Sequence, residues 1–462
     1  MSTTLVISQS IATQLNILTQ EKLETAGVLL VRVVPVDGGS QRLLSQEFHA
    51  VPEQAYLKRE VDSLTISSNG YVEALARAEK LGCAALWVHS HPGIDALPWP
   101  SVHDQIVDDE LSETFRIRSA SECYGALILS PGKNGVKFTG HFSTQDQVAR
   151  RIDRIWDVAD RYKLVLHEGT TLEEPLGMYD RNVRAFGTAI QVALGELTVG
   201  IVGCGGTGSA VAEQLVRLGV RKFVLLDPQT LTDSNVTRVY GSNLGDVDRP
   251  KVDICADNIR SIARNAEVEP WRSTVTVADF AKRLTRCDVV FGCTDDNAGR
   301  LVLSRLSTYF LLPIIDCGVL ISSEKGTDEV VGIDGRVTVL TPGSACLLCR
   351  ERIDVAKAQA EFLTPEERKR REDEGYAPAL GNTEPAVVTF TTLVAATAVN
   401  ELLERLIGYG PQTRPSEVLL RCHEREISTN LAGPRMNHYC HPAAGKLGLG
   451  FTKPFLEMAG LQ

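Results

Sequence analysis

The chain has 462 residues, of which 43% are hydrophobic, and it carries 48 basic against 58 acidic residues. This length suggests two or three domains, and the composition excludes a disordered or collagen-like protein. A net charge of −10 argues against nonspecific binding to nucleic acid or to an anionic membrane. The N-terminus lacks the basic and apolar regions of a signal peptide, and 11 scattered cysteines are typical of reduced thiols. We therefore expect a cytoplasmic protein.

The sequence predicts an α/β protein made of successive regions. Residues 1–165 mix strands and helices, residues 166–178 form a linker, and residues 179–415 alternate strands with helices in the manner of a largely parallel sheet. Residues 416–462 form a tail that contains Cys and His. The expected strands are Gly27–Val34, Ala84–Val88, Tyr124–Leu129, Leu197–Val202, Phe223–Leu226, Asp288–Gly292 and Pro313–Asp316, and the expected helices are Tyr71–Leu81 and Ala210–Leu218.

Two later segments have unusual compositions. The uncharged run Pro385–Asn400 is shorter than the about 20 apolar residues that span a bilayer, so it predicts a buried helix. The segment Glu351–Gly375 is densely charged, which is typical of a solvated helix face or a loop.

A first group of polar residues has the spacing of a hydrolytic metal site. An apolar strand ends in His89 and His91, which alternation places on one strand face. Asp104, on a helix that Ser101 caps, supplies an oxygen ligand. Two imidazoles and a carboxylate with an open fourth position suit a catalytic zinc that binds water. Glu24, just before another apolar strand, is the candidate base.

This pattern of Glu, then His-x-His-Pro, then Ser-x-x-Asp resembles the JAMM (also called JAB/MPN) metalloproteases. The resemblance covers about the first 145 residues, with a slightly longer loop between His91 and Asp104. It implies a JAB/MPN-type mixed α/β domain that cleaves after the C-terminal Gly of ubiquitin-like proteins. By this resemblance His89, His91 and Asp104 bind zinc, Glu24 acts as base and Ser101 stabilises the tetrahedral intermediate.

A second group begins with a glycine-rich turn between an apolar strand and a helix. Glycines allow a tight turn and a close approach to phosphate at the helix N-terminus. The next strand ends in Asp227, where a ribose-binding acid belongs. The turn alone is also compatible with an NAD-dependent dehydrogenase. Its glycines are Gly203, Gly205, Gly206 and Gly208.

The segments around this turn resemble the ThiF/MoeB-type adenylation domain of ubiquitin-activating enzymes. They read YDRNVRAFG, DPQTLTDSNVTRVYG, RPKVDICADNI and FGCTDDNAGR. The resemblance runs from Tyr179 to about residue 410 and implies a Rossmann-like fold with ATP and Mg²⁺. It assigns ribose binding to Asp227, phosphate contacts to Asn235, Arg238 and Lys251, Mg²⁺ binding to Asp295, and a contribution across a dimer interface to Arg181. Gln229 departs from the family, which often has a second Asp there.

The cysteines raise two separate questions. Cys346 and Cys349 form a C-x-x-C pair, and with Cys440 and a nearby His they predict a structural zinc site, unmetallated thiols being the alternative. No Cys lies between Arg350 and Arg421, where activating enzymes carry their thioester-forming residue. The acyl-adenylate then passes directly to an acceptor, or to Cys317 or Cys422, or to a hydroxyl such as that of Thr383.

Both regions point to one kind of substrate. The leading hypothesis is a bifunctional enzyme, a homodimer requiring Zn²⁺, ATP and Mg²⁺, that processes a ubiquitin-like protein and adenylates its C-terminal Gly for conjugation, with a conjugating enzyme as a further partner. The alternative is activation and thiocarboxylation of a sulfur-carrier protein, with a sulfur donor as partner. A third hypothesis is a non-catalytic scaffold that binds such proteins. No nucleic acid or membrane partner is expected.

Overall fold

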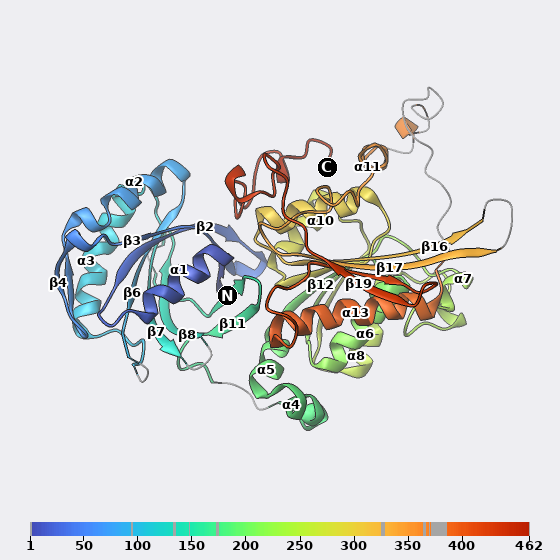
Figure 1. The fold of residues 1–462 in the computed structure, drawn as a ribbon, viewed down its shortest axis with the longest axis horizontal. Helices are drawn as coiled ribbons and strands as arrows, with labels where there is room; N and C mark the ends of the chain where they lie inside the picture. Colours follow the sequence, from blue (N-terminus) through green and yellow to red (C-terminus); the bar gives the residue numbers. More distant parts are fainter. Residues whose placement is uncertain are drawn as a thin grey trace. The chain divides into compact units, whose positions relative to one another are not determined.

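The structure is a computed structural model that describes residues 2–93, 96–132, 135–146, 148–171, 175–324, 329–363, 366–368, 370 and 386–461. The chain divides into two compact units (Figure 1). Unit 1 comprises Met1–Leu172 together with Gly448–Gly450, and unit 2 comprises Glu173–Leu447 together with Phe451–Gln462. The functional boundaries expected from the sequence remain predictions.

Unit 1 is a mixed α/β unit built on a nine-stranded sheet. Its strand order is β11-β10-β1-β3-β2-β6-β7-β8-β9, with β4 and β5 as a separate pair. The strands are β1 (Thr3–Ile7), β2 (Ala26–Pro35), β3 (Gln41–Ala50), β4 (Tyr56–Arg59), β5 (Leu64–Ile66), β6 (Ala84–Ser90), β7 (Tyr124–Gly132), β8 (Gly135–Ser143), β9 (Arg150–Arg151), β10 (Arg154–Val158) and β11 (Tyr162–Leu166). The helices are α1 (Gln9–Gln20), α2 (Val72–Leu81) and α3 (Val102–Arg118).

Strand β2 shows why this sheet is covered on both faces. Successive side chains of a strand point to opposite faces. Leu29 and Val31 pack in a core with α1, whereas Val28 and Leu30 pack in a second core with α2 and α3. Since these four consecutive residues are all apolar, β2 is stable only where both of its faces are buried, as they are in this sheet.

Unit 2 is built on an eight-stranded sheet with the order β14-β13-β12-β15-β16-β17-β18-β19. The strands are β12 (Thr198–Val202), β13 (Lys222–Leu226), β14 (Glu267–Trp271), β15 (Val289–Gly292), β16 (Ile314–Ser323), β17 (Val330–Leu340), β18 (Glu417–Arg421) and β19 (Glu426–Asn430). The helices are α4 (Asp180–Phe186), α5 (Thr188–Glu196), α6 (Gly206–Leu218), α7 (Asp233–Val236), α8 (Lys251–Ile262), α9 (Ala278–Arg283), α10 (Asn297–Tyr309), α11 (Val355–Glu361) and α13 (Val388–Ile407).

This sheet is parallel on one side and antiparallel on the other. Strands β14, β13, β12, β15 and β16 pair in parallel, whereas β17, β18 and β19 follow as antiparallel strands. Helices α6, α8 and α13 lie on one face of the sheet and α10 and α11 lie on the other (Figure 1). The chain adds β13 and β14 on one side of β12 and then β15 and β16 on the other, so ligands are expected at the carboxyl ends of β12 and β15, the switch point of such sheets.

The structure confirms the expected strands and helices of both regions, with shifted ends. The strand expected to end at Asp316 continues to Ser323 because it pairs with β17 beyond the parallel strands. The helix expected over Pro385–Asn400 is α13, which starts at Val388 and ends at Ile407 with its apolar side buried. No helix among the described residues is long and apolar enough to cross a membrane.

Two segments have more regular structure than the sequence suggested. Strands β18 and β19, which lie in the segment interpreted as a tail, extend the sheet of unit 2. Within Glu351–Gly375, the helix α11 is described and buries Ala358 and Ala360, while residues 364, 365, 369 and 371–375 lie outside the described part. Thr383 also lies outside it.

Candidate nucleotide site and candidate metal centres

The glycine-rich turn after β12 leaves no room for a side chain at Gly203 or Gly208. Gly203 has φ +91°, and a Cβ at Gly208 would lie 1.8 Å from the carbonyl oxygen of Gly203. Helix α6 begins at Gly206, and no side chain caps its N-terminal amides. These amides therefore remain available for an anion, as at phosphate-binding turns.

Asp227, directly after β13, is held against this turn. Its Oδ2 accepts from the backbone N–H of Cys204 at 2.7 Å and its Oδ1 accepts from that of Gln229 at 2.8 Å. Burial raises the pKa of Asp227, while these two hydrogen bonds and the charge of Lys251 counteract the shift. The carboxylate is thus fixed in orientation beside the turn, where the sequence predicts a ribose-binding acid.

Lys251, the first residue of α8, is buried next to Asp227. Its Nζ donates to Oε1 of Gln229 at 2.7 Å. Burial lowers the pKa of Lys251, whereas the charges of Asp227 and Asp295 raise it. Gln229 therefore links the two charged residues, since its backbone N–H binds Asp227 and its side chain binds Lys251. The sequence identified Gln229 only as a departure from the family.

The other residues predicted to contact phosphate or Mg²⁺ differ in how closely they approach the start of α6 and in their exposure. A Cβ on Gly206 would lie 3.2 Å from Cγ and Cδ of Arg238, so Arg238 packs across the first turn of α6. The charge of Arg238 acts on Lys251 together with that of Asp295, which places these groups in one electrostatic neighbourhood. Asn235 is buried in α7, and Asp295 is exposed between β15 and α10.

Arg181 is not brought into this group. It lies exposed on α4 and, in the described part of the chain, makes no hydrogen bond or ion pair with the other predicted residues. A role within one chain's site is therefore unsupported by the geometry, whereas a role across an interface is compatible with its exposure.

Unit 1 brings the predicted zinc ligands together. Nε2 of His89 lies 3.3 Å from Oδ1 of Asp104, and Nε2 of His91 lies 3.6 Å from Oδ2 of Asp104. One ligand atom from each residue lies within 4.8 Å of the others. Both ring nitrogens of His89 are buried, and neither makes a hydrogen bond among the described residues, although Nε2 lies close to Asp104. Because buried imidazole nitrogens without hydrogen bonds are costly, a metal ion fits this donor set.

The side chains around this group are also oriented. Nδ1 of His91 lies 3.0 Å from the carbonyl oxygen of Leu97, an arrangement that leaves Nε2 free to bind a metal. Ser101 caps α3: its Oγ accepts from the backbone N–H of Asp104, and Asp104 accepts from the backbone N–H of Ser101. The cap confirms the predicted start of the helix and fixes the position of the carboxylate.

Glu24 is the remaining member of the predicted hydrolytic group. Its Oε1 lies 3.9 Å from Nε2 of His91. Burial raises the pKa of Glu24 to about 7, although the charge of His91 opposes the shift. A carboxylate with a pKa near neutrality is suited to accept and return a proton.

Unit 2 contains a second candidate metal centre made of sulfur and nitrogen atoms. Sγ of Cys349 lies 3.6 Å from Sγ of Cys440 and 3.4 Å from Nδ1 of His438, and Sγ of Cys346 lies 3.6 Å from the same nitrogen. Three thiols and one imidazole at these spacings fit a tetrahedral structural zinc. His438 thus supplies the fourth candidate ligand, while His441 caps a short helical turn instead.

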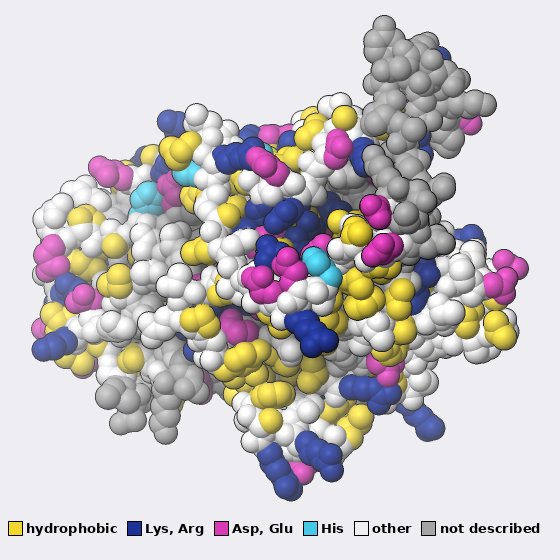
Figure 2. Space-filling view, turned by 45° about the vertical axis from the view of Figure 1, so that its right-hand side comes forward, with side chains coloured by type: hydrophobic (Ala, Val, Ile, Leu, Met, Phe, Trp, Pro, Cys, Tyr) yellow, Lys and Arg dark blue, Asp and Glu magenta, His cyan; other side chains and the backbone are white. Residues whose placement is uncertain are grey.

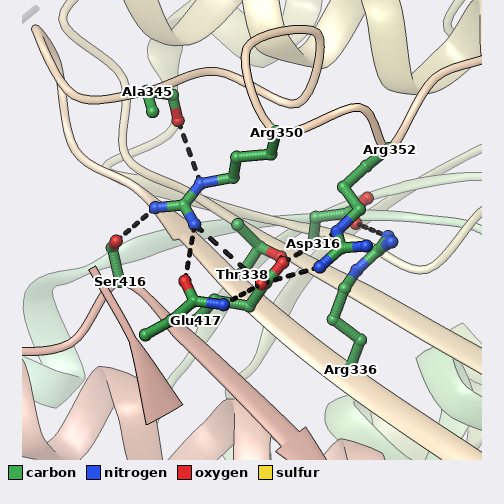
Figure 3. Close-up of polar contacts among 9 residues, drawn as sticks. Asp316, Arg336, Thr338, Ala345, Arg350, Arg352, Ser416 and Glu417 are labelled. Carbon is green, nitrogen blue, oxygen red and sulfur yellow. Dashed lines mark hydrogen bonds and ion pairs between the residues drawn. The ribbon is translucent and has the colours of Figure 1, made fainter. Parts of the chain in front are cut away.

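Unit 2 also contains a polar cluster that the sequence analysis missed. Asp316 of β16 and Glu417 of β18, both buried, lie among arginine side chains from β17 and from the segment that follows it (Figure 3). These residues are distant in the sequence, and the sequence motifs assign a role to none of them. Only the pairing of β16 with β17 and of β17 with β18 brings them together.

The fold and the turn define unit 2 as a Rossmann-like nucleotide-binding unit. Residues 179–441 match the ThiF family, so the chain belongs to that family. The molybdopterin-synthase adenylyltransferase of Escherichia coli K12 is 28% identical over 38% of this chain and 68% of its own length. The ubiquitin-like modifier-activating enzyme 5 of Bombyx mori is 27% identical over 47% of this chain and 53% of its own length. The SAMP-activating enzyme E1 of Haloferax volcanii is 24% identical over 32% of this chain and 51% of its own length.

The chain thus spans about half to two thirds of the length of these relatives. Among solved structures, Escherichia coli MccB with ATP is 16% identical over 58% of this chain and 75% of that chain, with a TM-score of 0.45. Membership of the ThiF family overturns the dehydrogenase interpretation of the glycine-rich turn.

Proposed function

We propose that this protein adenylates the C-terminal carboxylate of a ubiquitin-like or sulfur-carrier protein, with ATP as the second substrate. The observation that carries the proposal is the convergence of Asp227, Lys251 and Arg238 on the uncapped start of α6, within the region that belongs to the ThiF family. Hydride transfer leaves the phosphates of its cofactor intact, whereas adenylation develops negative charge on the phosphates of ATP, which two cations at this point can stabilise.

The reaction needs one bond made and one broken. A carboxylate oxygen of the protein substrate attacks the α-phosphorus of ATP, the bond from that phosphorus to the oxygen bridging to the β-phosphate breaks, and pyrophosphate leaves. The α6 amides, Lys251 and Arg238 stabilise the negative charge on the phosphates, and Asp227 accepts hydrogen bonds from the ribose hydroxyls. Asp295 would hold Mg²⁺, which when bound neutralises further phosphate charge.

Pyrophosphate exchange tests this proposal. The full chain is incubated with ATP, Mg²⁺, labelled pyrophosphate and purified sulfur-carrier or ubiquitin-like proteins that end in Gly-Gly, and label is expected to enter ATP. Asp295→Ala should abolish the exchange, whereas Asp279→Ala, on the exposed side of α9, should not. Exchange that is absent with every such protein, or that persists in Asp295→Ala, would contradict the proposal.

The acyl group of the adenylate can pass to a sulfur donor or to a target protein. We propose that it passes to sulfur, so that sulfur transfer is favoured over conjugation. Two of the relatives are named as adenylyltransferases for molybdopterin synthase and for the sulfur carrier ThiS, and others as activating enzymes for ubiquitin-like modifiers. The mass of the carrier after reaction with ATP and a sulfide source separates the two outcomes. A terminal thiocarboxylate supports sulfur transfer, and an isopeptide-linked product without thiocarboxylate contradicts it.

We also propose that Arg181 acts on the nucleotide of a second chain. Its exposure on α4 and its separation from the other candidate residues support this role. A mixture of Arg181→Ala and Asp295→Ala proteins should then regain exchange activity through hybrid dimers, and a fully active monomer by light scattering would exclude it.

A second candidate function is metal-dependent hydrolysis in unit 1, by the JAMM-like set of residues. The specific observation that favours it is the grouping of the His89, His91 and Asp104 ligand atoms, with buried His89 ring nitrogens that make no hydrogen bond among the described residues. Zinc bound there would lower the pKa of a water molecule. Glu24 would take the proton, and the Ser101 hydroxyl would donate to the developing oxyanion.

The test separates metal binding from turnover. Glu24→Gln should retain zinc and lose cleavage of a linear fusion after the Gly-Gly of a ubiquitin-like protein, because the base is not a ligand. Replacing His89 and His91 by Ala should lose both the zinc and the cleavage but keep pyrophosphate exchange. Cleavage that survives the double substitution would eliminate this function.

A further inference from the structure

A cluster of four arginines and two carboxylates lies on the face of the unit 2 sheet that α10 covers. Figure 3 shows both carboxylates with Arg336, Arg350 and Arg352. Asp316 of β16 pairs with Thr338 of β17, which pairs with Glu417 of β18, so their side chains share one face. Arg336 lies on the same face of β17. The other three arginines come from α10 and from the segment between β17 and α11, and they are Arg300, Arg350 and Arg352.

The charges of this cluster do not balance. Arg352 binds both oxygens of Glu417 at 3.1 and 2.9 Å. Asp316 accepts a hydrogen bond from Nη2 of Arg336 at 2.7 Å, and Nε of Arg300 lies 3.5 Å from its other carboxylate oxygen. Arg350 donates to neutral oxygens of Ala345, Ser416 and Asn430 and stays 4.0 Å from Glu417. Four cations therefore face two carboxylates.

The excess charge lies at an opening. The side chains of Arg300, Arg336 and Arg352 are 16%, 17% and 32% exposed, whereas that of Arg350 is 3% exposed. A Cβ on Gly318 would lie 3.4 Å from Nη2 of Arg336 and 3.7 Å from Nη2 of Arg300, so two guanidinium ends meet above a residue without a side chain. The space-filling view shows Lys and Arg side chains gathered in a hollow on this side (Figure 2).

The cluster lies beside the candidate nucleotide site along the sheet. Asp316 pairs with Gly292, which pairs with Val202, the residue before the glycine-rich turn. Two strand spacings, about 10 Å, therefore separate Asp316 from the start of that turn. An extended peptide covers this distance with about three residues.

We propose that Arg300 and Arg336 bind a carboxylate in the C-terminal segment of the protein substrate, an inference that rests on the proposed adenylation. The phosphates of ATP already have Lys251, Arg238 and the start of α6, whereas the carboxylate substrate has no other assigned cation. Guanidinium groups bind carboxylates through paired, charge-assisted hydrogen bonds. The carboxylate is either an acidic side chain about three residues before the terminus or the terminal carboxylate itself.

Four fluorescein-labelled octapeptides distinguish these sources by fluorescence anisotropy with the full chain. They end in Glu-Ala-Gly-Gly or Gln-Ala-Gly-Gly, each with a free or an amidated C-terminus. Removing the recognised carboxylate should weaken binding about tenfold or more. A loss on Glu→Gln assigns the site to an acidic side chain, and a loss on amidation assigns it to the terminus.

Two variants test the residues. Arg300→Gln removes one cation but leaves Asp316 paired with Arg336, and Gly318→Val fills the opening without changing any charge. Each should abolish the preference for the carboxylate peptide. Arg421→Gln is the matched control, because Arg421 lies on the same sheet face, two residues beyond the partner of Arg336, and pairs with Glu426 instead.

Several outcomes would overturn the proposal. They are equal binding of all four peptides, no binding of any peptide, an unchanged preference in both variants, or a loss in Arg421→Gln as large as in Arg300→Gln. Inorganic pyrophosphate that displaces the carboxylate peptide and binds through Arg300 more tightly than the peptide would make this a phosphate site. Pyrophosphate exchange is measured separately, so carboxylate-dependent binding without exchange would refute only the adenylation.

Discussion

Lys251 offers a test in which activity and stability should move in different directions. Its ammonium group is buried, its pKa is lowered by burial, and its hydrogen bond to Gln229 is to a neutral acceptor. In the nucleotide-free protein the charges of Asp227 and Asp295 offset this desolvation only in part, since the pKa of Lys251 stays lowered. Replacing Lys251 by Met keeps the aliphatic volume and removes the charge.

The size of the expected effect follows from the charge alone. A cation about 4 Å from a phosphate oxygen contributes about 4 kcal/mol at an effective dielectric constant near 20, which is an upper bound. That corresponds to roughly a thousandfold in the dissociation constant for ATP. Without ATP, Lys251→Met should be at least as stable as the unmodified protein, because the substitution removes a desolvated charge.

Calorimetric titration with ATP and thermal unfolding without ATP measure the two quantities. Lys222→Met is the matched control, because Lys222 stands at the start of β13, half-exposed, and pairs with Glu196. An affinity for ATP that is unchanged in Lys251→Met would refute the assigned role. So would a fall in melting temperature large enough to explain the lost binding by unfolding.

Two further predictions concern the metal centre of unit 2 and a buried acid of unit 1. Cys349→Ser should lose one zinc per chain by atomic emission and destabilise unit 2 by at least about 2 kcal/mol in urea, whereas Cys422→Ser should do neither. Burial raises the pKa of Asp157 from 3.8 to about 6, so the native state binds more protons than the unfolded one in that window, and stability falls as the pH rises through it. Asp157→Asn, which can still accept from the N–H of Ala159, should then be more stable by up to about 3 kcal/mol at pH 7 and by nothing below about pH 4. A pH-independent difference would contradict that cause.

The sequence predicted those parts of the fold that depend on local patterns. Apolar runs of strand length around a glycine-rich turn indicated β12, β13 and α6, and Ser101 three residues before Asp104 indicated the start of α3. In each case the residues that determine the structure lie within a few positions of one another. The proximity of His89 and Asp104 was predicted from the same local patterns, since the end of one strand positions His89 and the capped start of one helix positions Asp104.

The antiparallel half of the unit 2 sheet was not predictable in this way. Strand β17 contains Gly332, Asp334, Gly335 and Arg336, which weaken the apolar pattern of a strand. Its pairing with β18 joins residues about eighty positions apart, and no local signal specifies such a pairing. The charged cluster around Asp316 depends on this pairing and was missed with it.

The last prediction concerns the residue or molecule that accepts the acyl group from the adenylate. The burial of the cysteine side chains reduces the number of possible acceptors within the chain. Cys317 is fully buried, and its hydrogen bond to Cys293 and its desolvation raise its pKa, so it is a poor nucleophile. Cys346, Cys349 and Cys440 belong to the candidate zinc centre, where a thiolate bound to metal is not free to accept an acyl group. Cys422, half-buried at the end of β18, is then the remaining cysteine among the acceptors considered from the sequence.

We therefore expect direct transfer from the adenylate to an external acceptor. Acid-quenched reactions with ATP and the carrier protein, separated without reductant and mapped by mass spectrometry, should show free acyl-adenylate and no adduct on the chain. Cys422→Ser should leave the rate of product formation unchanged. A stoichiometric thioester on Cys422 that disappears in this variant would refute direct transfer, because the antiparallel extension of the sheet would then carry the acyl group itself.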